Sequence, residues 1–413
     1  MLRTRWQAIA TILFAAVLMR IWDIGDPIIH VDEQYYLLVG DHLLHGAVPF
    51  VDIWDRKPIG LFLLYAAIRL LPGDGIVAYQ IVAMLFAALT ALLVAKGGRM
   101  LGASRGGAVT AGIAYLIMLE LLGGRGGQAP VFYNLPMTFA GLLTLRLPDL
   151  AQRRAHDAII ANGLAACLLA GLAIQIKYTA AVEGAFFGTA HLWFLIRARA
   201  RWPLVGVATL GWAAAGLGPT ALVLGWYAEH GLFAPFWFAN FASIGLRAGY
   251  PVGQLAMRML GIGAQLSPLV AGVILGWRWR SDSARFGVAF GWLAAAVIGF
   301  VAIGTFFDHY ALPLIAPLAI SAAVAMGRSG RLAIRNIGIG SGAVAGRNTR
   351  PARRCSGGTC GGPDRRREPT RPMSLCLYRR HDHLSPGRCM FADPLRLPEF
   401  PRLYDGTGRD GDR

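Results

Sequence analysis

The sequence predicts an all-α membrane protein with about ten or eleven transmembrane helices. Of its 413 residues, 55% are hydrophobic and only 15% are charged. The hydrophobic residues form long continuous runs, and a run of about 18 or more matches the thickness of a bilayer core. Helices are expected because a backbone in contact with lipid must satisfy its own hydrogen bonds.

Ten hydrophobic runs predict spans, and an eleventh run is weaker. The ten are residues 6–22, 75–95, 108–122, 131–147, 158–175, 180–196, 203–227, 262–277, 286–306 and 311–326. The eleventh, residues 332–345, is rich in glycine and is interrupted by Arg335 and Asn336. These runs predict one multi-span domain over residues 1–346.

The basic residues divide the connections between these runs into two groups. One group holds 17: Arg3, Arg5, Lys96, Arg99, Arg105, Arg146, Arg153, Arg154, Arg197, Arg199, Arg201, Arg278, Arg280, Arg285, Arg328, Arg331 and Arg335. The other holds 7: Arg56, Lys57, Arg69, Arg125, Lys177, Arg247 and Arg258. Cytoplasmic loops carry the excess of Lys and Arg, so the N-terminus is expected in the cytoplasm. The net charge of +17 thus reflects topology and does not indicate nucleic-acid binding.

The run at residues 58–71 decides the topology of everything after it. With 14 residues it is short for a span and suits an interfacial helix. If it crossed the membrane, every later loop would change side and the charge asymmetry would disappear. We therefore expect it not to span, so that residues 23–74 form one long outer loop.

Two outer loops stand out by their composition. In the first, Tyr36, Val39 and Leu43 share one helical face and Gly46 is a natural helix stop, which predicts a short amphipathic helix on the membrane. The second, residues 228–261, contains the aromatic run FAPFWFANF, as suits the lipid headgroup zone.

The first outer loop concentrates carboxylates in an otherwise apolar chain. The eight are Asp23, Asp26, Asp32, Glu33, Asp41, Asp52, Asp55 and Asp74. For most of them a hydrated loop is a sufficient explanation. Asp32 and Glu33 differ because they begin a predicted helix at the membrane boundary, where a partly desolvated carboxylate can act as a general base.

Three further elements are candidates for binding a substrate. Lys57 precedes the apolar run that begins at Pro58, which directs its ammonium group to the interface, where it could bind a lipid phosphate. Snorkelling, or pairing with Asp55, is an equally good explanation. Lys177, at the outer end of a span, is a second candidate for the same anion. His309 and Tyr310, also at an outer span end, are either an interfacial pair or a contact for sugar or phosphate.

From residue 347 to residue 413 the composition changes to Arg, Pro and Gly without an apolar span. Such a tail is either a disordered segment or the product of a shifted reading frame. The abrupt onset favours the second explanation. We therefore expect this tail to lie outside the membrane domain.

Three segments carry a resemblance to a known family: HVDEQYYLLVGDHLLHGAVPFVDIWDRKPIG, LAIQIKYTA and FFDHYALPLIAPLAI. In this order, over about residues 5 to 330, they resemble the GT-C fold glycosyltransferases that use polyprenyl-phosphate sugars, namely the protein O-mannosyltransferase and aminoarabinose lipid A transferase relatives. The first segment is fairly specific and the others are supportive. The chain differs in having Ile59 where the family commonly has a second proline, and we expect it to lack the family's last spans and any outer C-terminal domain.

The resemblance implies a function and roles for particular residues. Asp32, with Glu33 beside it, would be the catalytic base, and Lys57 would meet the lipid phosphate. The sugar would pass from a polyprenyl-phosphate donor to a hydroxyl group of a lipid, glycan or protein of the cell envelope, with inversion. This would occur at the outer face of the bacterial inner membrane. No cofactor is required by this chemistry, and a divalent cation at Asp32 and Glu33 is left open.

Two other functions stay open at the level of the sequence. A transporter or flippase would carry charges and Gly/Pro breaks inside paired spans near the bilayer midplane, whereas this chain concentrates its charges at one face. A non-catalytic subunit of envelope assembly would have no need for acids and a cation in one loop. No nucleophile–base triad, phosphate-binding loop or His/Cys metal cluster is visible in the sequence.

Overall fold

The computed structural model describes residues 4–29, 31–246 and 249–328, and the regular elements of these residues are helices. The longer ones are α1 (Arg5–Arg20), α4 (Gly75–Met100), α5 (Arg105–Leu121), α6 (Ala129–Thr144), α8 (His156–Ile174), α9 (Ala180–Arg197), α10 (Trp202–Glu229), α12 (Val252–Arg278), α13 (Ser283–Ile303) and a last helix, Asp308–Arg328. The shorter ones are α2 (Val31–Leu44), α3 (Ile59–Arg69), α7 (Leu147–Gln152) and α11 (Phe233–Asn240). Three 3-10 turns are Ile21–Asp23, Ala242–Leu246 and Asp308–Ala311.

Each of the ten predicted spans coincides with a helix. Within the described residues, seven helical segments are long and apolar enough to cross a membrane: Arg5–Asp23, Gly75–Met100, His156–Ile174, Trp202–Glu229, Val252–Arg278, Ser283–Ile303 and Asp308–Arg328. The helices α5, α6 and α9 occupy the other three predicted spans and have 17, 16 and 18 residues. The chain is therefore a multi-pass membrane protein by its helices, while the count of ten spans stays a prediction. The eleventh run and the tail lie outside the described residues.

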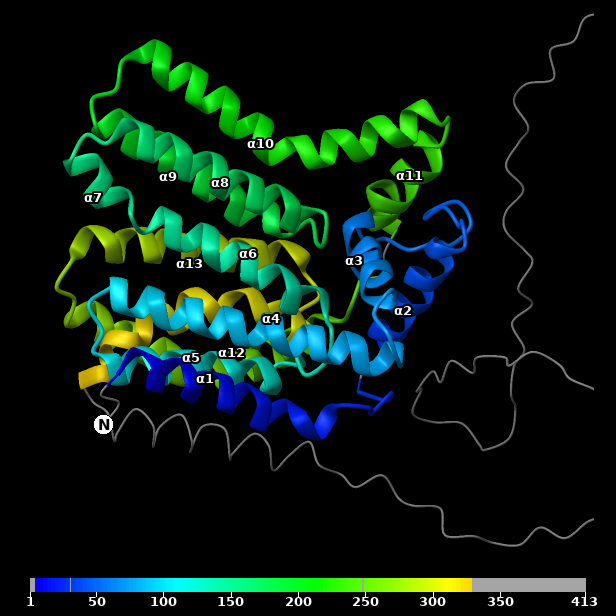
Figure 1. The fold of residues 1–413 in the computed structure, drawn as a ribbon, viewed down its shortest axis with the longest axis horizontal. Helices are drawn as coiled ribbons and strands as arrows, with labels where there is room; N and C mark the ends of the chain where they lie inside the picture. Colours follow the sequence, from blue (N-terminus) through cyan, green and yellow to red (C-terminus); the bar gives the residue numbers. More distant parts are fainter. Residues whose placement is uncertain (1–3, 30, 247–248, 329–413) are drawn as a thin grey trace, which may run out of the picture. The chain divides into compact units, whose positions relative to one another are not determined.

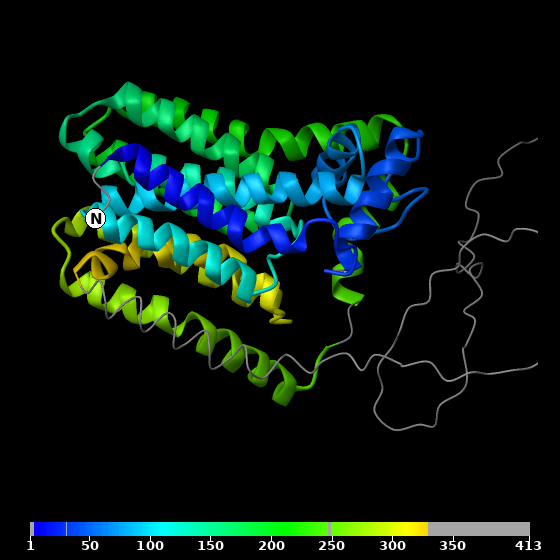
Figure 2. The ribbon, with the colours of Figure 1, turned by 60° about the horizontal axis from the view of Figure 1, so that its bottom comes forward.

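The long helices run alongside one another and leave the short helices at the two ends of the bundle (Figure 1). At one end, called the loop end here, lie α2, α3 and α11, which belong to the connections 24–74 and 230–251. The opposite end, called the basic end, holds α7, the start of α1 and the connections 101–104, 198–201 and 279–282. Figure 2 shows the same separation from a second direction. The two predicted outer loops therefore meet at one end of the bundle.

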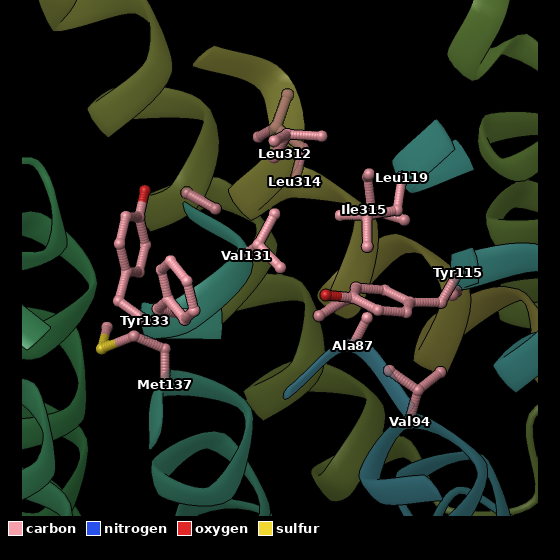
Figure 3. Close-up of a cluster of buried hydrophobic side chains, with 14 of the residues drawn as sticks. Ala87, Val94, Tyr115, Leu119, Val131, Tyr133, Met137, Leu312, Leu314 and Ile315 are labelled. Carbon is pink, nitrogen blue, oxygen red and sulfur yellow. The ribbon is translucent and has the colours of Figure 1, made fainter. Parts of the chain in front are cut away.

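The core of the bundle is built around the last helix. Its residues are largely buried, and Leu312, Leu314 and Ile315 lie among side chains of α4, α5 and α6 (Figure 3). Tyr115 of α5 and Tyr133 of α6 are among the largest side chains that are fully enclosed. This packing fixes the position of the last helix, and with it the segment around Tyr310 at the loop end.

The helix α3 is short, as its sequence predicts. Its 11 residues rise about 16 Å at 1.5 Å per residue, whereas a bilayer core is about 30 Å thick. The apolar face of α2 was predicted to lie on the membrane. In the structure it packs against α3 and the bundle instead. Tyr36 and Val39 are 0% and 1% exposed. Gly40 makes this possible, since a Cβ atom there would lie 2.7 Å from the backbone nitrogen of Ala66.

The connection after α10, which was predicted to be the second outer loop, is shorter than the sequence predicts. The helix α12 begins at Val252, ten residues before the expected start of its span, so the connection after α10 covers only residues 230–251. Arg258, which was counted among the basic residues of the connections, lies within α12, and its guanidinium carbon is 4.4 Å from the ring centre of Tyr250 and 4.1 Å from that of Phe307. Arg258 also donates to the carbonyl oxygen of Thr305 at 2.8 Å. These contacts accommodate the charge within a helix.

Candidate active site at the loop end

The connection predicted to be the first outer loop folds into α2, a turn and α3, and most of its carboxylates serve this local structure. Asp52 accepts from the backbone nitrogen of Val48 at 2.7 Å, and Asp74 caps α4 by accepting from the nitrogen of Ile76 at 2.8 Å. Asp26 accepts from the nitrogen of Ile28, Asp41 pairs with Arg69 at 3.0 Å, and Asp23 pairs with Arg125. These five carboxylates therefore have structural partners, which leaves Asp32, Glu33 and Asp55.

Lys57 lies between two of these remaining carboxylates. Its Nζ atom is 3.9 Å from Oδ2 of Asp32 and 3.8 Å from Oδ2 of Asp55. The same nitrogen lies 4.7 Å from the ring centre of Tyr36, whose hydroxyl group donates to Oδ2 of Asp32 at 3.1 Å. The Lys57 side chain is 31% exposed and that of Asp32 is 46% exposed. The pair can therefore reach a molecule in the solvent or the interface.

Asp55 is the less accessible member of this group, with its side chain 17% exposed. Its Oδ1 atom also accepts from the backbone nitrogen of Arg56. The next side chain along, Arg56, donates to the hydroxyl oxygen of Ser243 at 3.2 Å, which ties this segment to the second outer loop. Asp55 thus holds Lys57 in place from the protein side, while Asp32 faces outward.

Glu33 differs from Asp32 in its surroundings. It is 0% exposed, and its Oε1 lies so close to Gly126 that a Cβ atom there would be 2.7 Å away. Burial raises the pKa of Glu33 to about 8, and the negative charge of Asp32 adds to the effect. The backbone of Glu33 itself, the charge of Lys57 and the side chain of Gln128 act in the opposite direction, although neither carboxyl oxygen forms a hydrogen bond within the described part of the chain. Glu33 is therefore mostly protonated at neutral pH and is enclosed by the glycine-rich loop between α5 and α6.

The hydroxyl group of Tyr36 stays protonated at all ordinary pH values. Burial raises its pKa well above 10, and the charges of Asp32 and Asp55 act in the same direction. Tyr36 was predicted only as part of an apolar helix face. The structure adds that its hydroxyl group orients Asp32 by a hydrogen bond.

Lys177 and the segment around Tyr310 also lie together. The Nζ atom of Lys177 is 4.2 Å from the ring centre of Tyr310, and the rings of His309 and Tyr310 are 4.4 Å apart. The neighbouring Tyr178 donates to Oδ1 of Asn240 in α11 at 2.7 Å. The structure thus brings Lys177, His309 and Tyr310 into one cluster, as the sequence alone could not show.

A direct contact between α3 and the end of α8 joins two sets of residues. One is the Lys57 group, made of Lys57, Asp32, Asp55 and Tyr36, and the other is the Lys177 cluster, made of Lys177, His309 and Tyr310. The backbone nitrogen of Leu61 donates to the carbonyl oxygen of Gln175 at 3.1 Å. Gly60 permits this approach, because a Cβ atom there would lie 2.6 Å from that oxygen. The connection 230–251 contacts the residues next to both lysines in the sequence, through Ser243 to Arg56 and through Asn240 to Tyr178. Residues from four distant segments therefore form one candidate site.

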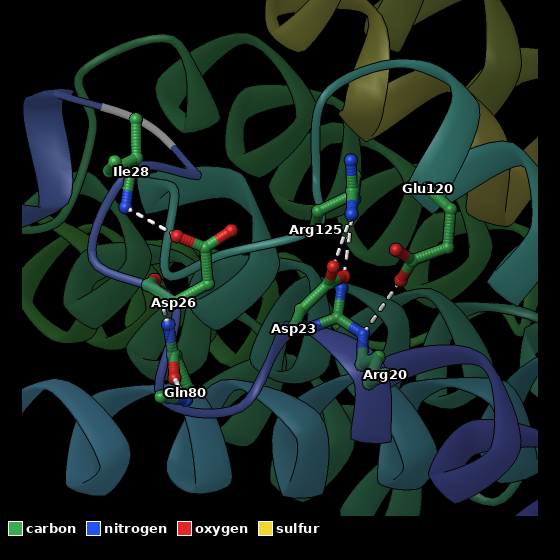
Figure 4. A network of polar contacts seen from close by, with 8 residues as sticks. Arg20, Asp23, Asp26, Ile28, Gln80, Glu120 and Arg125 are labelled. Atoms are coloured by element: carbon green, nitrogen blue, oxygen red, sulfur yellow. Dashed lines mark hydrogen bonds and ion pairs between the residues drawn. The ribbon is translucent and has the colours of Figure 1, made fainter. Parts of the chain in front are cut away.

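A second polar network at the loop end was not predicted from the sequence. Nε of Arg20, at the end of α1, lies 2.8 Å from Oε1 of Glu120 in α5, and Arg20 also donates to the carbonyl oxygen of Gly124. Arg125 forms an ion pair with Asp23 beside it (Figure 4). The signal that could have found it is Arg20 itself, since a charge inside an apolar span needs a partner. This network anchors the glycine-rich loop that encloses Glu33.

In the part of the chain that the structure describes, no group of three or more His, Cys, Asp or Glu side chains is arranged to hold a metal ion. A cation between Asp32 and Asp55 would have to take the place that the Lys57 ammonium group now holds.

The chain was also compared with protein-family models and with curated proteins, and nothing matches it.

Proposed function

We propose that this chain is a membrane glycosyltransferase of the GT-C type. It transfers a sugar from a polyprenyl-phosphate donor to a hydroxyl group of a cell-envelope acceptor, with inversion at the anomeric carbon. The observation that carries this proposal is the placement of Lys57 between Asp32 and Asp55, at the end of the bundle where both large loops meet. A cation and an accessible carboxylate in contact suit a reaction that needs a base and an anionic leaving group.

Lys57 is the proposed partner of the donor phosphate. An ammonium group binds phosphate as a point charge, and charge-assisted contacts are stronger than neutral hydrogen bonds. Lys57 lies directly before α3, a helix too short to span, and α3 packs against the end of α8. The lipid tail would lie between helices. Lys177, His309 and Tyr310, which lie beyond the packing of α3 against α8, would contact the phosphate or the sugar.

Asp32 is the proposed general base. Its carboxylate takes the proton of the acceptor hydroxyl group while the hydroxyl oxygen forms the new bond to the anomeric carbon. The bond from that carbon to the phosphate oxygen breaks, and the polyprenyl phosphate leaves with the electron pair. Attack opposite to the leaving group inverts the anomeric centre through an oxocarbenium-like transition state, by analogy with glycoside hydrolysis. Tyr36 orients the base, and the Lys57 ammonium group stabilises the charge on the departing phosphate.

Glu33 receives a different role from Asp32 in this proposal. A buried carboxyl group with a pKa of about 8 cannot reach an acceptor, although it lies next to the base along the chain. We assign it to positioning the start of α2 against the glycine-rich loop. The charge asymmetry of the loops supports a cytoplasmic N-terminus and a site on the outer face of the bacterial inner membrane.

The proposal is tested with the purified protein in lipid nanodiscs that contain a polyprenyl-phosphate sugar with a radioactive sugar group. A glycosyltransferase releases the sugar to water or to an added acceptor and leaves polyprenyl phosphate. A flippase moves the intact donor between leaflets of a vesicle without cleaving it, and a non-catalytic subunit does neither. Transport without cleavage by a protein shown to be folded would contradict the proposal.

A further inference from the structure

A cavity lies at the basic end of the bundle, and the candidate active site lies at the opposite end. Its volume is about 290 Å³. The lining comes from the connection between α4 and α5, from the connection between α12 and α13, and from the end of the last helix. Its lining residues are Arg99, Gly102, Ala103, Ser104, Trp279, Ser281, Val324, Gly327 and Arg328. Because three separate segments enclose it, the cavity is a product of the tertiary fold.

The side chains that line this cavity favour an anion. Among the described residues of the lining, two carry guanidinium groups, Arg99 and Arg328, two carry hydroxyl groups, Ser104 and Ser281, and none carries a carboxylate. Asp282, which follows Ser281 of the lining, and Asp149 of α7 share one arginine outside the lining. Asp282 lies 3.4 Å from Nε of Arg285, and Asp149 pairs with the same arginine. The cavity therefore keeps a net positive charge.

Local contacts give the cavity a defined shape. Arg99 donates to the carbonyl oxygen of Ala103, which fixes its guanidinium group on the lining. Two glycines keep space that a side chain would fill. A Cβ atom at Gly327 would lie 2.6 Å from the hydroxyl oxygen of Ser104, and one at Gly102, where φ is +90°, would lie 2.7 Å from that of Ser281.

We propose that this cavity is a binding site for a phosphate-bearing anion, supplied by the headgroup of an anionic phospholipid or by free phosphate. Guanidinium groups bind phosphate oxygens through charge-assisted hydrogen bonds, and basic pockets between membrane helices bind anionic lipid headgroups. The cavity lies at the end of helices that can cross a membrane, which is the level of a headgroup layer. This site is independent of the proposed transferase activity.

The test measures lipid retention by native mass spectrometry of the purified full chain, after exchange with phosphatidylglycerol or phosphatidylcholine. The variant Arg99→Gln/Arg328→Gln removes both charges of the cavity. The control Arg153→Gln/Arg201→Gln removes two exposed charges at the same end of the bundle. Ser281→Trp fills the cavity without a change of charge. Melting temperatures of all variants confirm that each protein is folded.

We expect the wild type and the control to retain phosphatidylglycerol over phosphatidylcholine, and both cavity variants to bind it at least about tenfold more weakly. A titration with inorganic phosphate identifies the source. Phosphate binding that depends on Arg99 and Arg328, without lipid preference, assigns the site to the free anion. Equal retention of both lipids by all four proteins, together with no phosphate binding, would overturn the proposal.

Discussion

Lys57 and Asp32 are in contact within the connection 24–74, with 3.9 Å between the ammonium nitrogen and a carboxylate oxygen. One residue precedes α3 and the other belongs to the first turn of α2, so the packing of α2 on α3 brings them together. Tyr36 contacts both of them, by a hydrogen bond to Asp32 and by its ring below Lys57. The contact makes distinct roles for the two residues testable.

Replacement of Asp32 by Asn should abolish most of the transfer activity. The amide keeps the size of the side chain and its hydrogen bond from Tyr36, but it cannot take a proton. A positioned base contributes about 10²–10⁴-fold to such a rate, so a loss on this scale is expected in the nanodisc assay, with donor binding retained. Asp52→Asn, which changes a carboxylate with a purely local partner, is the matched control. Activity close to that of the wild type in Asp32→Asn would remove Asp32 as the base.

Replacement of Lys57 by Met should weaken donor binding. Methionine keeps an apolar stem and loses the charge, and a charge-assisted contact is worth about 1.5–3 kcal/mol, which corresponds to about a ten- to hundredfold weaker affinity. The control is Lys96→Met, because Lys96 lies near the basic end of α4. Equilibrium binding of the labelled donor to both variants gives the comparison. An unchanged affinity in Lys57→Met would show that Lys57 only pairs with its neighbouring carboxylates.

Glu33 should make the stability of the protein depend on pH. Its pKa is about 8 in the folded protein and about 4.5 when exposed, so between these values the folded state binds more protons than the unfolded state. Stability from this group therefore falls as pH rises from about 4.5 to 8, by at most about 1.4 kcal/mol per pH unit.

Glu33→Gln mimics the protonated form and removes this dependence. We expect the melting temperature of the wild type to fall more steeply than that of Glu33→Gln between pH 5 and pH 8. Near pH 7 the variant should keep most of its transfer activity, since Glu33 is not the base. Parallel melting curves would show that Glu33 ionises normally. A complete loss of activity in a folded Glu33→Gln would exchange the roles of Glu33 and Asp32.

The topology can be tested with single cysteines in a background without other cysteines. Ala47 and Gly249 belong to the two connections at the loop end, and Arg153 lies at the basic end. Cysteines at the first two positions should react with a membrane-impermeant thiol reagent added to intact cells, and one at Arg153 should react only after lysis. Labelling of the Arg153 position in intact cells, with Gly249 protected, would mean that the residues of α3 cross the membrane.

The sequence by itself determined the helical class, the locations of the long helices and the extent of the connection between α1 and α4. These features depend on local properties, because an apolar run of about 20 residues in lipid has to form a helix whatever its neighbours are. The same reasoning predicted that α3 does not span, and it singled out Asp32, Glu33 and Lys57 as unusual residues. It did not find the early start of α12, where aromatic rings around Arg258 accommodate a charge.

The resemblance put Asp32 ahead of its neighbour Glu33, but only the tertiary structure showed that their surroundings differ. The two residues have nearly the same chemistry and adjacent positions, but successive residues of a helix point in different directions. Asp32 faces solvent and Lys57, while Glu33 is enclosed by a loop that follows α5. The approach of that loop, the contact of Gly60 with Gln175 and the cavity between Arg99 and Arg328 all join segments far apart in the chain. Such contacts depend on how helices pack, which no local pattern in the sequence contains.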